Sequence, residues 1–257
     1  MIQFHDLRKA FDDHVVLDGF TLEVRDGETM VIIGFSGSGK SVALKHVVGL
    51  LHPDAGDVIV DGRAVSAQDR AGLSALRGDI GFVFQFAALF DSMTVADNVA
   101  LGLRRRGLSD EELAERVAEA LALVDLTGTD ALLPAELSGG MRKRVGIARA
   151  IALRPRYLLY DEPTTGLDPV TSAVMDRLMV RAREHLGVTG LVVTHDMRSA
   201  YTVGDRIAML YEGRIKQVGT VAEIQRSDDP VVRQFIEGRP SSPPLPIGRG
   251  GQGVRQT

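Results

Sequence analysis

The stretch that most constrains this chain is GFSGSGKS, residues 34–41, which lies between an apolar run at 29–33 and an amphipathic stretch at 42–51. A strand, a glycine loop and a helix start form the arrangement that binds nucleotide phosphates. The glycines can adopt positive φ and let the main chain approach an anion, and the free N–H groups of the helix start add to the site. Lys40 supplies a positive charge for the β and γ phosphates, and the Ser41 hydroxyl is placed to ligate Mg²⁺. The residues predicted to bind the nucleotide here are Gly34, Phe35, Ser36, Gly37, Ser38, Gly39, Lys40 and Ser41.

Length and composition limit the class of protein in which this loop can occur. At 257 residues, with 44% hydrophobic and 25% charged residues, the chain can bury one large core and a subdomain. No apolar run approaches the roughly 18 residues that span a bilayer, and the first residues lack a signal-peptide pattern. The absence of cysteine excludes disulfides and fits a reducing interior. A net charge of -4 argues against nucleic acid as a partner.

Short apolar runs alternate with helical patterns, which predicts an α/β fold with a parallel sheet. Strands are expected at residues 21–24, 29–33, 80–84, 157–160 and 190–194, with hairpins at 58–65 around Asp61-Gly62 and at 207–218 around Glu212-Gly213. A helix should begin at Ser109, where Glu112 completes a capping box, and another should run from Ser138 toward Leu153. Residues 239–257 hold four prolines and four glycines but no acidic residue, so we expect this tail to be flexible.

Five further motifs accompany the loop. The apolar segment 157–160 ends in Asp161 and Glu162, and in nucleotide hydrolases of this kind the first carboxylate holds Mg²⁺ and the second accepts a proton from the attacking water. LSGGM precedes a helical pattern, DEPTTGLDP starts at the carboxylate pair, His195 follows the apolar run LVVT, and Gln85 ends IGFVFQ.

In this order the motifs resemble those of an ATP-binding cassette ATPase, over about residues 1–225. The resemblance implies a P-loop ATPase fold with a mixed sheet core, an antiparallel β subdomain and a helical subdomain at about 86–155. The cassette would occupy residues 1–238, and ATP and Mg²⁺ would be its cofactors. Fold alone does not identify the cargo.

The resemblance also implies a role for each matching residue. Phe11 resembles the aromatic that stacks on adenine, and Gln85 resembles the residue that contacts Mg²⁺ and the attacking water. With Ser41, Asp161 would ligate the metal, Glu162 would be the catalytic base, and His195 would contact the γ-phosphate.

The signature segment is implied to close over ATP that is held by a second protomer. It starts a helix with small residues, which suits the approach of an anion. Its residues are Leu137, Ser138, Gly139, Gly140 and Met141. Asp168 resembles the aspartate that communicates across this dimer. The resemblance thus implies a homodimer in which each copy completes the site of the other.

A narrower resemblance concerns the cargo. Met141 follows LSGG where most importers carry Gln, and the segments 136–153, 88–99 and 227–238 are similar to the ATPase of Mla-type phospholipid transporters. That group works with an integral membrane permease, an MCE lipid-binding protein and a small accessory subunit. The ATPase is peripheral on the cytoplasmic face of the bacterial inner membrane, and its C-terminal extension reaches the partner protomer. The chain departs from common usage at Phe35, where a small residue or proline is frequent.

Several alternatives stay open. The chain could serve another importer, of amino acids or ions, or it could be a soluble cassette ATPase of iron–sulfur assembly. The apolar segment 86–95 could form a groove for a permease helix or the core of the helical subdomain. Arg104-Arg105-Arg106 could face anionic headgroups or the permease, or could be a solvated face.

Overall fold

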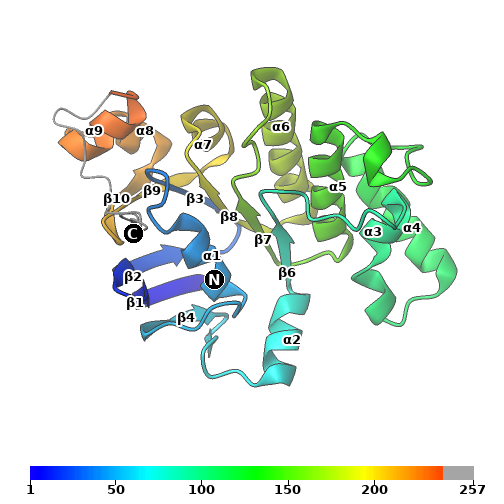
Figure 1. The fold of residues 1–257 in the computed structure, drawn as a ribbon, viewed down its shortest axis with the longest axis horizontal. Helices are drawn as coiled ribbons and strands as arrows, with labels where there is room; N and C mark the ends of the chain where they lie inside the picture. The colour runs from blue at the N-terminus through cyan, green and yellow to red at the C-terminus, as the bar shows by residue number, and fades with distance from the viewer. Residues whose placement is uncertain (240–257) are drawn as a thin grey trace, which may run out of the picture.

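The computed structural model describes residues 1–239, which form two sheets and a group of helices at one side (Figure 1). The larger sheet has six strands in the order β10-β9-β3-β8-β7-β6, and all neighbouring pairs are parallel except β9 with β10. Every residue of its central strands β3, β7 and β8 is buried, as expected for a parallel sheet that is covered on both faces. The strands are β3 (Thr29–Ile33), β6 (Ile80–Val83), β7 (Tyr157–Asp161), β8 (Thr189–Thr194), β9 (Arg206–Tyr211) and β10 (Arg214–Thr220).

The second sheet is antiparallel, with four strands in the order β2-β1-β4-β5. Its inner face packs with α1 and the larger sheet in one buried cluster, in which the rings of Phe4 and Phe20 meet edge to face at 5.0 Å. Its strands are β1 (Ile2–Phe11), β2 (His14–Val24), β4 (Ala55–Val60) and β5 (Arg63–Ala64).

The helices divide by position. Figure 1 shows α3, α4 and α5 together at one side of the molecule and α8 and α9 at the opposite end. The long helices α5 and α6 pack over the larger sheet in a second buried cluster. The helices are α1 (Lys40–Val47), α2 (Arg70–Gly78), α3 (Val95–Ala100), α4 (Asp110–Leu123), α5 (Gly139–Ala152), α6 (Pro169–Leu186), α7 (Met197–Val203), α8 (Val221–Gln225) and α9 (Pro230–Ile236), with short 3-10 turns at Leu103–Arg105 and Pro134–Glu136.

The predicted fold class is confirmed: a mixed sheet, an antiparallel sheet and helical elements are all present. Both predicted hairpins form, and their turns place Asp61-Gly62 and Glu212-Gly213 at positive φ, as a two-residue turn requires. The predicted capping box at Ser109 forms, and α5 begins directly after Ser138.

Two expectations differ from the structure. Strand β1 was not predicted, and β2 starts at His14 rather than at Thr21. Both strands leave several residues exposed, so their apolar residues do not form one continuous run. The predicted tail at 239–257 lies outside the described residues except for Arg239. Among residues 1–239, no helix combines the length and the apolar character needed to cross a membrane.

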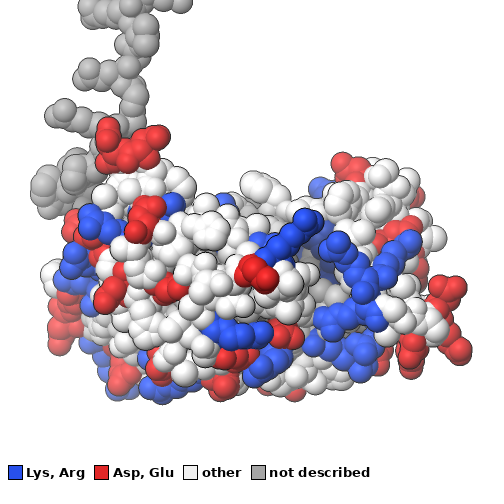
Figure 2. Space-filling model, turned by 90° about the horizontal axis from the view of Figure 1, so that it is seen from below, with Lys and Arg blue, Asp and Glu red and all other residues white. Residues whose placement is uncertain are grey.

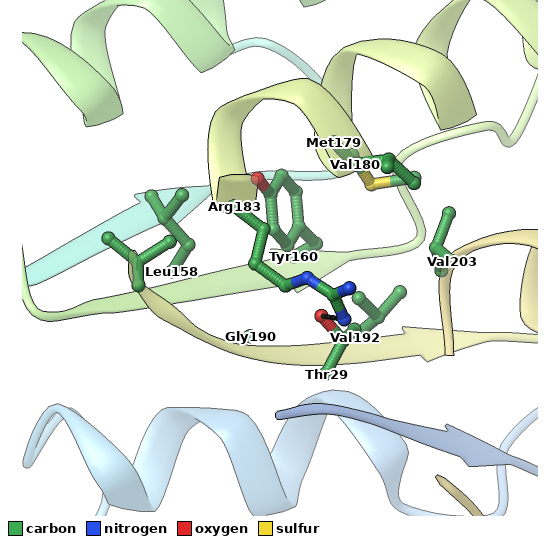
Figure 3. Close-up of a pocket in the computed structure, with 10 residues that line it drawn as sticks. Thr29, Leu158, Tyr160, Met179, Val180, Arg183, Gly190, Val192 and Val203 are labelled. Atoms are coloured by element: carbon green, nitrogen blue, oxygen red, sulfur yellow. Dashed lines mark hydrogen bonds between the residues drawn. The ribbon is translucent and has the colours of Figure 1, made fainter. Parts of the chain in front are cut away.

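A small cavity of about 10 Å³ lies behind the strand that carries the carboxylates, between β7, β8 and α6 (Figure 3). Tyr160 lines it, and its hydroxyl is buried and has no hydrogen-bonding partner among residues 1–239. Burial raises the pKa of Tyr160 because the phenolate could not be solvated there. Arg183 extends along the same cavity and donates to Thr29 Oγ1 at 3.4 Å.

Candidate functional site

The phosphate loop connects β3 to α1. Gly37 and Gly39 have φ of 78° and 100°, which only glycine adopts without strain, whereas Gly34 does not have positive φ. Gly34 is needed for space, because a Cβ there would lie 2.5 Å from the carbonyl oxygen of Leu210. The predicted freedom of φ therefore holds for two of the three glycines. Gly39 leads directly into α1, whose first N–H groups face the loop side.

Lys40 is the first residue of α1 and is buried, with 6% of its surface exposed. Its Nζ donates to the carbonyl oxygens of Gly34 at 2.8 Å and Phe35 at 3.0 Å, and lies 3.7 Å from Glu162 Oε1. Burial lowers the pKa of Lys40, and Glu162 and Asp161 partly oppose that shift. The ammonium group is thus folded back on its own loop, within reach of an incoming phosphate.

Asp161 ends β7 and accepts a hydrogen bond from Ser41 Oγ at 2.5 Å. Burial raises the pKa of Asp161, as does the adjacent Glu162, while Ser41 and two lysines lower it. A hydroxyl and a carboxylate are hard oxygen donors of the kind that Mg²⁺ prefers. Within residues 1–239, no group of three His, Cys, Asp or Glu side chains gathers as a metal site. A Mg²⁺ site here would therefore use few protein ligands and the phosphates, which is usual for this ion.

Glu162 and His195 lie in contact. Glu162 Oε2 is 2.8 Å from His195 Nδ1, and it also accepts from the Thr165 hydroxyl at 3.2 Å and from the His195 N–H at 3.3 Å. Glu162 is 8% exposed, whereas half of the His195 side chain is exposed. Glu162 has φ of 49°, a left-handed conformation that costs about 1–3 kcal/mol in a non-glycine residue. The backbone is held there by a hydrogen bond from the Glu162 N–H to the Val193 carbonyl at 2.9 Å.

Most of the residues predicted to bind ATP line one open hollow of about 550 Å³, whereas within residues 1–239 Gly34, Phe35 and Asp161 do not line it. Phe11, at the end of β1, forms one wall with 42% of its surface exposed, and Lys9 Nζ lies 5.5 Å from its ring centre. Gln85, which follows β6, and His195 also line the hollow, although both are far from Phe11 in the sequence. The lining residues are Phe11, His14, Val16, Ser36, Gly37, Ser38, Gly39, Lys40, Ser41, Val42, Gln85, Glu162, Thr165 and His195.

The signature segment lines a second hollow of about 460 Å³, and within residues 1–239 the two hollows share no lining residue. Ser138 is the N-cap of α5, and its Oγ accepts from the Met141 N–H at 3.2 Å. Gly140 has no room for a side chain, because a Cβ would lie 2.7 Å from Thr171 Cγ2. Leu137 is buried, and Met141 is partly buried against the core. The lining residues are Ser138, Gly139, Gly140, Arg144, Gly166, Leu167, Asp168, Val170, Thr171 and Val174.

Asp168 lies in this second hollow and caps α6. Its Oδ1 accepts from the N–H groups of Val170 at 2.9 Å and Thr171 at 3.0 Å, and its Oδ2 accepts from the Thr171 hydroxyl at 2.5 Å. These hydrogen bonds lower the pKa of Asp168, the Thr171 hydroxyl most. The carboxylate is thereby held ionised at the surface where a second chain could contact it.

Sequence reasoning missed two cations that tie the site together. Lys143, on α5, donates to the carbonyl oxygens of Pro163 at 2.9 Å and Thr165 at 2.6 Å. These hydrogen bonds connect the signature helix to the loop that follows Glu162. Arg149 donates to the carbonyls of Ala87 and Ala88, just beyond Gln85. Both lie in RKRVGIAR directly after the signature. Backbone carbonyls carry no sequence signal, so the cations of this stretch give no sign of which carbonyls they contact.

Comparison with known proteins identifies the family. The family described as "ABC transporter" matches residues 17–165. A "Probable ribonucleotide transport ATP-binding protein mkl" of Mycobacterium tuberculosis is 41% identical over 243 residues, which are 94% of this chain and 68% of that protein. A "Methionine import ATP-binding protein MetN" of Xylella fastidiosa is 42% identical over 92% of this chain and 72% of its own length. "Protein TRIGALACTOSYLDIACYLGLYCEROL 3, chloroplastic" of Arabidopsis thaliana is 41% identical over 95% of this chain and 75% of its own length.

A solved structure agrees with this. The dimeric ATP-binding cassette MJ0796, in a post-hydrolysis state bound to ADP and Pi, superposes with a TM-score of 0.79 at 34% identity, over 86% of this chain and 99% of that one. The chain therefore belongs to the ABC transporter family, as an ATP-binding cassette. It is an ATPase, the ATP-hydrolysing subunit of a transporter.

Proposed function

We propose that this chain powers phospholipid transport as the ATPase of an Mla-type complex, on the cytoplasmic face of a bacterial inner membrane. The observation that carries this proposal is the segment 136–153, ELSGGMRKRVGIARAIAL, in which Met141 follows LSGG. The name of the Arabidopsis relative includes the name of a galactolipid, and this supports a lipid cargo. The partners would be an integral membrane permease, an MCE lipid-binding protein and a small accessory subunit.

In this proposal the working unit is a homodimer. The phosphate hollow and the signature hollow have different lining residues within residues 1–239, which supports a signature that contacts the ATP of another chain. The dimeric form of MJ0796 supports the same arrangement. Two copies would sandwich two ATP molecules, and each would present Ser138, Gly139 and Gly140 to the γ-phosphate held by its partner.

Each residue at the phosphate hollow can take a separate role in ATP hydrolysis. Lys40 would leave the carbonyls of its loop and bind the β and γ phosphates, and Mg²⁺ would be held by Ser41, Asp161 and Gln85 and would neutralise phosphate charge. Water attacks the γ-phosphorus, the bond to the β-phosphate oxygen breaks, and Glu162 accepts the proton of the water. His195, hydrogen bonded to Glu162, would orient that carboxylate and contact the γ-phosphate. The products are ADP and phosphate.

The permease would dock in an apolar hollow of about 690 Å³ between β6 and the end of α3. Phe82, Phe84 and Phe90 line it, and the nearby Phe86 is 79% exposed, which favours a groove at this end of segment 86–95. At the other end Val95 is fully buried in the helical core, so each of the two interpretations of the segment fits part of it.

Basic residues border the groove. On the face shown in Figure 2, Lys and Arg side chains gather mainly on the side of α3 and α4. Of the arginine run, Arg105 lines the groove, Arg104 lines it and pairs with Asp97, and Arg106 donates to the Gly78 carbonyl at the end of α2. The groove would thus receive a short amphipathic helix whose polar face is acidic.

The test is to purify the chain with its complex from native membranes and to identify the co-purified proteins and lipids by mass spectrometry. The proposal predicts a permease, an MCE protein and bound phospholipid. Reconstituted vesicles should then exchange labelled phospholipid only when ATP is present, and Lys40→Ala should abolish that exchange. A chain that co-purifies with no membrane protein would instead favour the iron–sulfur assembly alternative.

A second candidate is a solute importer, and the methionine-import relative at 42% identity favours it. An importer would co-purify with a solute-binding protein rather than an MCE protein. Its ATP hydrolysis in vesicles should rise when that binding protein is loaded with solute, and should not respond to phospholipid donors. The same purification therefore separates the two candidates.

A further inference from the structure

The unusual Phe35 of the phosphate loop contacts the C-terminal helix. Its ring meets the ring of Phe235 on α9 edge to face, with centres 5.1 Å apart at 82°, and lies 6.2 Å from Tyr211 at the end of β9. Phe35 and Phe235 are both partly buried against the same core cluster. Residues 200 positions apart thus form a small aromatic cluster that contains the second residue of the loop.

Helix α9 is itself fixed to the sheet. Asp229 caps it by accepting from the N–H groups of Val231 at 2.9 Å and Val232 at 3.2 Å, and Lys216 on β10 pairs with the Asp229 carboxylate at 3.2 Å. The Val232 side chain is fully buried. Phe235, one turn further along, is therefore presented to Phe35 from a supported position.

The backbone of Phe35 contacts the group that would bind phosphate. The Phe35 carbonyl accepts from Lys40 Nζ at 3.0 Å and from the Ser38 N–H at 3.1 Å. The preceding Gly34 is pressed so closely on Leu210 that a side chain there would clash. A shift of the Phe35 side chain would therefore move the carbonyl that holds Lys40 and the turn that precedes Gly39.

We propose that Phe235 is a positioning residue for nucleotide binding: α9 holds Phe35, and through it the phosphate loop, in the conformation that accepts the β-phosphate. The inference rests on the proposed role of residues 34–41 as the phosphate site. Aromatic pairs of this geometry contribute enough to change an affinity about two- to tenfold. The C-terminal helix would then set the nucleotide affinity of the cassette without touching the nucleotide.

The test is calorimetric titration of the full chain with Mg²⁺-ADP, which is not hydrolysed. Phe235→Ala should weaken binding about three- to tenfold, and Phe235→Tyr, which keeps the ring, should restore most of the affinity. The matched control is Val231→Ala on the same helix, which should stay within about twofold of the parent protein. If a thermal scan shows that Phe235→Ala is not folded, Phe235→Leu is used in its place, because leucine keeps most of the apolar volume but has no ring.

A double-mutant cycle separates a positioning role from general loosening. In a Phe35→Ala background, Phe235→Ala should have little further effect on the affinity for ADP, because it acts through Phe35. In ATPase assays Phe235→Ala should raise KM and leave kcat within about twofold. Unchanged affinity in a folded Phe235→Ala protein, or an equal loss in both backgrounds, would overturn the inference.

Lys40→Ala distinguishes failure of this inference from failure of the site. If Lys40→Ala binds Mg²⁺-ADP as tightly as the parent protein, residues 34–41 are not the phosphate site and the proposed function fails with the inference. If Lys40→Ala loses binding while Phe235→Ala keeps it, only the role of Phe235 is wrong.

Discussion

The phosphate hollow and the signature hollow are built on opposite principles. The first places Lys40, Asp161 and Glu162 in buried positions, each with less than 9% of its surface exposed, and holds Glu162 at positive φ. The second uses helix N-caps, Ser138 and Asp168, that satisfy their own helices at the surface. Removing charges from water costs free energy that pairing only partly returns, so the first hollow is built at a cost in stability. The second costs little, because its polar groups satisfy the ends of their own helices, and in the proposed dimer it would receive the γ-phosphate of the partner's ATP.

The unsatisfied groups follow the same division. Among residues 1–239, the buried side-chain atoms without a hydrogen-bonding partner are Ser38 Oγ, His46 Nε2, Tyr160 Oη and Asp176 Oδ1. They lie in the phosphate loop, on α1, on β7 and on α6, and none lies on α5, which carries the signature. Two of the four, Ser38 and His46, lie in the phosphate loop and the helix that follows it, and Tyr160 lies on the strand that ends at Asp161. The predictions below alter either a residue of one hollow or a buried polar group, and they measure turnover, nucleotide affinity or stability.

The largest effect is expected from Glu162→Gln. The substitution keeps the size of the side chain and an oxygen for His195, but it removes the base, so turnover of ATP should fall by about 100-fold or more. Affinity for Mg²⁺-ADP should change little, because the phosphate loop is untouched. Steady-state ATPase assays and calorimetry measure the two. Glu184→Gln, an exposed substitution on α6, is the control, and unchanged turnover in Glu162→Gln would remove Glu162 from the role of base.

Asp176, on α6, tests the cost of burying a carboxyl group. It is 5% exposed, contacts Ser199 on α7, and burial raises its pKa to about 6, with Asp196 contributing. Between about pH 4 and pH 6 the folded protein therefore holds more protons at this group than the unfolded chain does. The free energy of unfolding should fall as the pH rises through this window, because the folded state must then bury a carboxylate.

Asp176→Asn removes that dependence. Relative to the parent protein it should be more stable by about 3 kcal/mol at pH 8, and the difference should shrink toward zero near pH 4. Urea denaturation at the two pH values measures it. Asp91→Asn, an exposed substitution, should show no such trend. A stability difference that does not vary with pH would contradict the assignment of the shift to Asp176.

Ser138→Ala addresses the signature hollow. Ser138 does not line the phosphate hollow, so affinity for Mg²⁺-ADP should be unchanged. In the proposed dimer the partner's ATP would lose a hydroxyl contact, so turnover should fall about tenfold. Loss of the N-cap also costs about 1 kcal/mol of stability. Ser109→Ala is a matched control, because Ser109 caps α4 with the same geometry and lines neither hollow. An equal loss of turnover in Ser109→Ala would assign the effect to stability alone.

The sequence predicted the parts of the molecule whose geometry is local. Glycines and caps are needed where a loop approaches an anion or a helix begins, so the strand-loop-helix at 29–47 and the caps at Ser109 and Ser138 could be placed from spacing alone. The two-residue turns were predictable for the same reason. The grouping of motifs into two separate hollows followed from the family resemblance rather than from any local pattern.

Long-range packing was not predictable. Nothing near Phe35 in the sequence indicates that Phe235 will contact it, because the pairing depends on how β10 and α9 return to the loop. Lys143 and Arg149 turn inward to backbone carbonyls, and carbonyls carry no sequence signal. β1 was missed because its apolar residues are separated by exposed ones and bulges in its pairing with β2. In each case the sequence does not show which distant part of the chain packs against the residue.

The smallest effect concerns two tyrosines of strand β7 that face opposite sides of the sheet. Tyr160 buries a hydroxyl without a partner, so Tyr160→Phe should raise the free energy of unfolding by about 1 kcal/mol. Tyr157 donates to Asp61, so Tyr157→Phe should lower it by about the same amount. Turnover should stay within about twofold in both. Denaturant midpoints show whether each substitution stabilises or destabilises the protein. If Tyr160→Phe destabilises it, the Tyr160 hydroxyl has a hydrogen-bonding partner, and the phosphate hollow has fewer unsatisfied polar groups around it than we infer.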